Sequence, residues 1–140
     1  VRRAITDLSV ALDEAIRKSS HGWDRIESIV KRVFRLANNR PELLGLLREV
    51  TRLGPPMLTY AVDGIRPLLE GATMWLTEEM KAGRVRKSDP ELLVLSAYST
   101  IMGAAAEVKL FEALGEESTI RDVAIRRQEL LRFLKIALIP

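Results

Sequence analysis

The sequence predicts an all-α fold, an irregular bundle of about six helices. Apolar residues recur every three or four positions over most of the 140 residues, which is the spacing of amphipathic helices. Clusters of glycine, proline and asparagine interrupt this pattern at intervals that suit helices of ordinary length. No stretch alternates apolar and polar residues, or gathers β-branched residues, as a strand does.

The composition indicates one folded domain. Apolar residues make up 47% of the chain and charged residues 29%, a balance that argues against disorder. There is no cysteine, which excludes disulfides, thiolate metal sites and a thiolate nucleophile. Because the sequence shows no signal peptide and no apolar run of ~18 residues, we expect a cytoplasmic protein without a membrane partner. The net charge of +3 is spread over polar helix faces and does not by itself predict DNA binding.

The first three predicted helices are separated by polar turns. The first covers 3–18, where apolar residues lie on one side and charged residues on the other. The second covers 23–37, and its buried stripe includes Phe34. Pro41 suits the first position of the third helix, which we expect to reach residue 53.

The fourth helix follows the strongest breaker in the chain, Gly54-Pro55-Pro56, and is expected to reach residue 82. Gly64 and Pro67 occupy places where a helix is kinked or restarted. We therefore expect either one kinked helix or a short helix before the main one.

The fifth and sixth predicted helices cover 89–114 and 119–138. Asp89 and Pro90 suit the start of the fifth helix, and Gly115 suits its end. The fifth helix is apolar most of the way round, and the last helix carries two separate apolar sets. A helix of this kind is buried on two sides, so we expect one side to face the domain interior and the other a second subunit.

No catalytic constellation is present, and the sequence predicts neither an enzyme nor a metal or cofactor site. The one histidine, His21, has no partner at metal-ligand or acid–base spacing. Glu107 stands in the apolar helix, where an ion pair at a helix seam is favoured over a ligand contact. Glu78 and Glu79 are expected to face solvent.

A few aromatic and methionine side chains could line a site for an apolar ligand. These candidate ligand-binding residues are Phe34, Tyr60, Trp75, Tyr98 and Met102. Methionine adapts to varied apolar ligands, and tyrosine or tryptophan can fix a polar atom. Ordinary core packing explains the same residues, so both interpretations stay open.

Three segments together resemble a known family. They are the segment from Asn39-Arg40-Pro41-Glu42, the helix end from Glu78 through Gly83 to Arg86, and the helix start Asp89-Pro90-Glu91. This arrangement resembles the C-terminal regulatory domain of tetracycline-repressor-like (TetR) transcriptional regulators.

The resemblance implies a domain organisation. Residues 1–18 would be the linking helix from a missing N-terminal helix-turn-helix domain, as a start on Val1 within a helical pattern also suggests, and 19–140 the regulatory domain. The last two helices would pair with those of a second copy in a four-helix dimer interface. The residues expected at this homodimer contact are Ala105, Val108, Ile125, Phe133 and Ile136.

The resemblance also implies a function. A small apolar effector would enter between the helices at 22–37, 41–53, 56–82 and 89–114 and would alter DNA binding by the missing domain, most simply in a repressor. DNA would be a partner only through that domain. Two alternatives stay open: a helical carrier or enzyme for a small molecule, unrelated to transcription, and an interaction module without a cavity.

Overall fold

The fold is built from helices alone. The computed structural model describes residues 2–18, 22–106, 108–115 and 119–140, and these residues contain no strand. Its helices are α1 (Arg2–Lys18), α2 (Gly22–Asn39), α3 (Pro41–Leu53), α4 (Met57–Lys81), α5 (Pro90–Ala106), α6 (Val108–Ala113) and α7 (Ile120–Leu138). The predicted all-α irregular bundle is confirmed.

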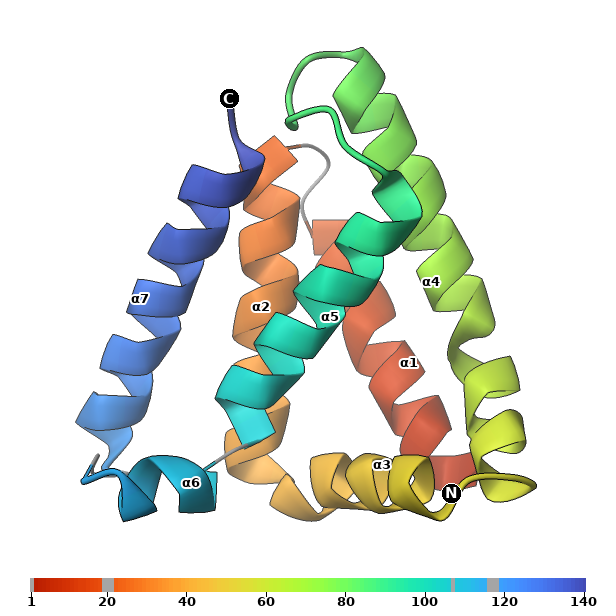
Figure 1. The fold of residues 1–140 in the computed structure, drawn as a ribbon, viewed down its shortest axis with the longest axis vertical. Coiled ribbons are helices and arrows are strands. Elements are labelled where there is room, and N and C mark those ends of the chain that lie inside the picture. The colour runs from red at the N-terminus through yellow and green to blue at the C-terminus, as the bar shows by residue number, and fades with distance from the viewer. Residues whose placement is uncertain (1, 19–21, 107, 116–118) are drawn as a thin grey trace.

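The helices run in two main directions. Figure 1 shows α1, α2, α4, α5 and α7 running along the length of the bundle, while α3 and α6 lie across one end. Helix α2 packs against α1, α3, α5 and α7, and α5 packs against α2, α3, α4 and α7. The interior is therefore shared by α2 and α5.

The segment predicted as one helix over 89–114 is two helices. Helix α5 ends at Ala106, and α6 begins at Val108 and runs at a steep angle to it (Figure 1). No proline or glycine stands next to the junction of the two helices in the sequence, so no local signal marks a break there. Phe111 of α6 packs against Arg126 in α7, whose guanidinium carbon lies 5.2 Å from the ring centre. A tertiary contact thus accompanies a break that local periodicity does not predict.

Helix α4 is the first of the two predicted alternatives, one helix that continues through Gly64 and Pro67. Gly64 has a packing role, because a Cβ built there would lie 2.6 Å from Cγ2 of Ile5 in α1. The glycine therefore permits α1 and α4 to approach closely.

Two apolar clusters form the core. The larger one joins α1, α2 and α3 with parts of α4, α5 and α7, and Val30 of α2 is fully buried in it. The smaller one contains Leu76, Met80, Val85 and Val94. The end of α7 is attached to this second cluster, since the backbone N–H of Arg86 donates to the carbonyl of Leu138 at 2.7 Å. The space between the two clusters is where the candidate site lies.

Candidate functional site

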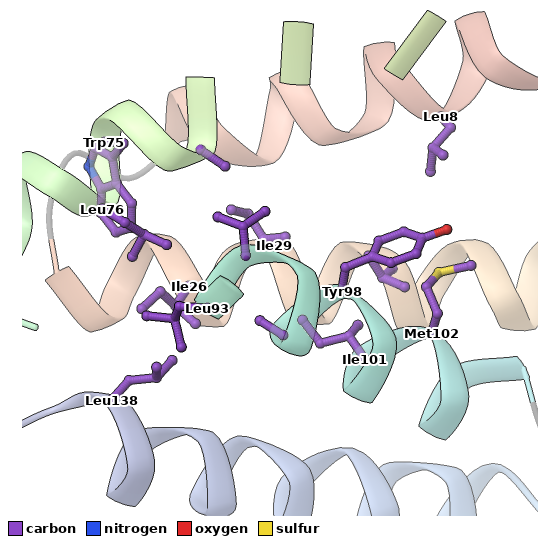
Figure 2. Close-up of a pocket in the computed structure, with 14 residues that line it drawn as sticks. Leu8, Ile26, Ile29, Trp75, Leu76, Leu93, Tyr98, Ile101, Met102 and Leu138 are labelled. Atoms are coloured by element: carbon purple, nitrogen blue, oxygen red, sulfur yellow. The ribbon is translucent and has the colours of Figure 1, made fainter. Parts of the chain in front are cut away.

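An apolar cavity of about 180 Å³ lies among α1, α2, α4, α5 and α7. Its lining residues are Leu8, Ile26, Ile29, Val33, Ala72, Trp75, Leu76, Leu93, Val94, Ala97, Tyr98, Ile101, Met102 and Leu138. Figure 2 shows these side chains converging from helices far apart in the sequence. An apolar cavity of about 150 Å³ holds a benzene-sized molecule, so this volume suits a small apolar ligand.

Helical periodicity explains how the sequence builds the walls. The α5 residues in the lining recur at spacings of one, three and four, which places them on one face of the helix. Helix α4 contributes Ala72, Trp75 and Leu76 with the same spacing. Ala72 and Ala97 are the smallest lining residues, and their short side chains leave volume that a leucine at either place would fill.

The described residues that line the cavity carry no charge. Its lining side chains are aliphatic or aromatic, apart from the thioether of Met102 and the polar atoms of Trp75 and Tyr98. In Figure 2 Trp75 lies at one end of the labelled set, and Tyr98 and Met102 lie together at the other, with the Tyr98 hydroxyl directed away from Trp75. Tyr98 is 41% exposed, so it stands at the edge of the cavity.

Tyr98 and Trp75 each have a distinct environment at the cavity. Burial raises the pKa of Tyr98 above its ordinary value of 10.0, so the phenol ionises less readily than a solvent-exposed tyrosine. The guanidinium of Arg25 in α2 lies 5.0 Å from the ring centre of Trp75. This cation–π contact fixes the indole at the end of the cavity.

Three of the five predicted ligand-binding residues, Trp75, Tyr98 and Met102, line the cavity. Phe34 does not, because it is 4% exposed and packs in the larger core cluster. Tyr60 does not either. It is 42% exposed, and its hydroxyl accepts a hydrogen bond from Nε of Arg2 at 2.7 Å on the outside of α1 and α4.

The sequence interpretation missed most of the aliphatic lining. Leu8 and Leu138 are helical core positions by periodicity, and a stripe of leucine gives no sign that space remains beside it. The expected helix at 41–53 does not line this cavity, and α1 and α7 do instead. Helix α3 borders a neighbouring cavity of about 300 Å³, lined by Leu47, Arg48, Thr51, Tyr98, Ser99, Met102 and Gly103.

The residues predicted at a dimer interface fall into three groups. Ile125, Phe133 and Ile136 are 48%, 61% and 67% exposed and share the outer face of α7. Ala105 is 6% exposed inside the larger core cluster, so it does not lie on the surface of the protomer. The side chain of Val108 lies outside the described part of the chain.

The structure also bears on the charged residues. Glu79, expected to face solvent, is 1% exposed, accepts a hydrogen bond from the backbone N–H of Gly22 at 2.9 Å, and pairs with Arg84. The loop after α4 carries Arg84 back to the carboxylate of Glu79. No local sequence pattern indicates this contact. His21 and Glu107 lie outside the described residues. Among the residues that are described, no three acidic or histidine side chains gather as a metal site.

The described helices include none that is both long enough and apolar enough to span a bilayer. Neither a protein-family model nor a curated protein matches the chain. A solved structure described as a protein with unknown function from Rhodococcus sp. RHA1 is similar, with a TM-score of 0.71 and 21% sequence identity. The match covers 93% of this chain and 66% of that protein, so the chain spans just under two thirds of its length. At this identity the likeness establishes the fold alone.

Proposed function

We propose that this chain is the effector-binding and dimerisation domain of a TetR-like transcriptional regulator, most simply a repressor. The resemblance in sequence motifs suggests the family. The observation that carries the proposal is that the apolar cavity is lined partly by α1, through Leu8. In the proposed arrangement α1 is the helix that links the regulatory domain to a DNA-binding domain.

The packing of α1 supports a role in transmission. Helix α1 contacts α2, α3 and α4, so it lies against three of the helices of the regulatory bundle. Its contact with α4 is tight at Ile5 and Gly64. A ligand that presses on Leu8 would favour one position of α1 over another. An effector with different affinities for two such arrangements shifts their populations, and a coupling of ~1–3 kcal/mol changes affinity at the other site by about 5–150-fold.

The dimer belongs to the same proposal. Ile125, Phe133 and Ile136 give α7 an outer apolar stripe, while Leu134 and Leu138 bury its inner face. Leu92 and Leu95 add exposed apolar area on α5, and Ser96, Ser99 and Gly103 keep that surface shallow enough for a second helix to approach closely. A second copy of this chain would cover both faces in a four-helix contact.

A helical carrier for a small apolar molecule is the second candidate, because the same cavity would serve it. It differs in predicting no response of α1 to ligand and no DNA-binding segment. Among the described residues the lining offers the Tyr98 hydroxyl for proton transfer and no carboxylate, imidazole or amine, so an enzyme is not the function we propose.

The segment encoded immediately before Val1 in the source gene tests the proposal. Three short helices with a helix-turn-helix pattern would support a regulator, and the joined protein should then bind DNA as a dimer. An unrelated domain in that place would overturn the regulator and leave the carrier.

A further inference from the structure

Tyr98 is the polar residue at one end of the apolar cavity. Among the described residues that line this cavity, only Trp75 and Tyr98 carry a side-chain N–H or O–H group. In Figure 2 the indole nitrogen lies on the side of Trp75 that faces away from the other labelled side chains. The hydroxyl of Tyr98 lies at the opposite end of the labelled set, where Leu8 and Met102 also lie. A ligand in the cavity would therefore meet one hydrogen-bonding side chain at this end.

The hydroxyl of Tyr98 can make a further hydrogen bond. Within the part of the chain that the structure describes, no residue hydrogen-bonds this hydroxyl. Burial raises the pKa of Tyr98, which is the effect of apolar surroundings on a phenol. A tyrosine hydroxyl can both donate and accept, and a buried one usually has a partner. A hydroxyl or carbonyl oxygen on a ligand would supply that partner.

The surroundings of the cavity disfavour a charged ligand. The guanidinium of Arg25 lies over the ring of Trp75 and does not line the cavity. Arg48 is the one charged residue among the described residues that line the neighbouring cavity beside α3, and it already has an interaction partner. A carboxylate or an ammonium group in the apolar cavity would lose hydration without gaining an opposite charge, which opposes binding. We therefore expect an uncharged ligand.

Two alanines and the cavity volume set the size of the ligand. The volume of about 180 Å³ is close to that of a cavity that holds benzene. Ala72 of α4 and Ala97 of α5 line the cavity with short side chains, so a larger residue at either place would fill it. The apolar body that fits is about one aromatic ring with a short chain.

We propose that the ligand of the apolar cavity is an uncharged molecule, about the size of one substituted aromatic ring, whose hydroxyl or carbonyl oxygen hydrogen-bonds the hydroxyl of Tyr98 and whose apolar body extends towards Trp75. The proposal rests on the proposed effector-binding function and names the ligand class for it. The ligand oxygen would lie at the end of the cavity where α1 contributes Leu8.

The test compares three ligands that share one body. Phenylbutanol carries a hydroxyl, butylbenzene lacks it, and phenylbutanoate carries a charge in its place. Dissociation constants for the 140-residue chain are measured by titration calorimetry, with butylbenzene measured by competition against phenylbutanol. The variant Tyr98→Phe removes the hydroxyl and keeps the ring. Tyr60→Phe is the matched control, because Tyr60 is equally exposed, hydrogen-bonds Arg2 and does not line the cavity.

We expect Tyr98→Phe to weaken phenylbutanol by about threefold to tenfold, as for the loss of one neutral hydrogen bond, and to leave butylbenzene unchanged. Tyr60→Phe should change neither dissociation constant. Phenylbutanoate should bind the unmodified chain at least about tenfold more weakly than phenylbutanol, because its charge finds no partner. Ala97→Phe should abolish binding of all three, because the ring occupies the cavity, and Ala72→Leu repeats this from the opposite helix.

The outcomes separate the two proposals. If phenylbutanol and butylbenzene bind and are lost in Ala97→Phe, but Tyr98→Phe weakens both equally or neither, the hydrogen bond to Tyr98 is wrong and the apolar effector cavity stands. An equal loss of phenylbutanol affinity in Tyr60→Phe would also overturn that hydrogen bond. Phenylbutanoate binding as tightly as phenylbutanol would overturn the uncharged ligand class. No binding of any of the three to the unmodified chain would overturn both the ligand class and the effector-binding function.

Discussion

Ile5 of α1 fits against Gly64 of α4 so closely that a single methyl group added at residue 64 would lie 2.6 Å from Cγ2 of Ile5. The methyl group of Ile5 is attached to a branched Cβ, so it cannot turn aside freely. The contact lies three residues before Leu8, which lines the cavity. The packing of α1 and the shape of the cavity are therefore parts of one region.

Gly64→Ala should destabilise the domain. The overlap with Ile5 forces α1 away from α4, and overpacking of this kind costs ~1–3 kcal/mol. Gly71→Ala is the matched control on the same helix, where an added Cβ meets nothing within 4 Å, and it should stabilise by ~0.5–1 kcal/mol. Chemical denaturation of both variants measures the difference. Equal stabilities would show that the two helices do not meet as described.

Glu79→Gln should lower the free energy of unfolding by about 1–3 kcal/mol. The variant keeps one acceptor for the N–H of Gly22 but loses the charge that pairs with Arg84. Glu78→Gln is the control, because its carboxylate is exposed and pairs with Lys81 at 3.6 Å, so its loss should be within ~0.5 kcal/mol. If Glu78→Gln lowers the free energy of unfolding as much as Glu79→Gln does, Glu79 is not buried as described.

Tyr98 should make the stability fall at alkaline pH. Burial raises the pKa of the folded phenol above 10.0, so the unfolded chain releases this proton first. The contribution is fully present below the unfolded pKa and is lost as the pH rises through the folded pKa. Tyr98→Phe should flatten this loss and remove from the tyrosinate absorbance titration a component that titrates above pH 10.0. If the component lost in Tyr98→Phe titrates at or below pH 10.0, the raised pKa of Tyr98 is contradicted.

Charge on the outer face of α7 should prevent dimer formation. Phe133→Glu and Ile136→Glu place a carboxylate on the exposed apolar stripe, and each should yield monomers in sedimentation velocity. Leu53→Glu is the control, since Leu53 is 59% exposed but lies at the end of α3. If both α7 variants remain dimers, the dimer contact does not include the outer face of α7. If the unmodified chain is a monomer, the proposed dimer is wrong.

The sequence predicted the helices well because their ends are set locally. Pro41 begins α3, and Gly83 follows α4 with a φ of +77°, a conformation that glycine adopts readily. The capping box of Thr119 and Asp122 sets the start of α7 in the same way. The break before α6 has no such local signal, and for this reason periodicity predicted one helix where there are two.

The cavity was only partly predictable. Residue type was enough to predict that Trp75, Tyr98 and Met102 line a cavity, because aromatic and methionine side chains are common in ligand-binding sites. Whether such a residue borders this cavity depends on tertiary geometry, and Phe34 and Tyr60 are not among the residues that line it. Leu8 and Leu138 lie near the two ends of the chain, and only the folded bundle brings them to the same cavity.

Hydrogen exchange of α1 with and without phenylbutanol tests the central claim, that occupancy of the cavity alters α1, the proposed linking helix. We expect amide protection in α1 to change when the ligand binds, and to stay unchanged in Ala97→Phe, whose cavity is filled. Protection that changes around α4 and α5 while α1 stays constant in the unmodified chain would contradict transmission through Leu8 and favour a carrier.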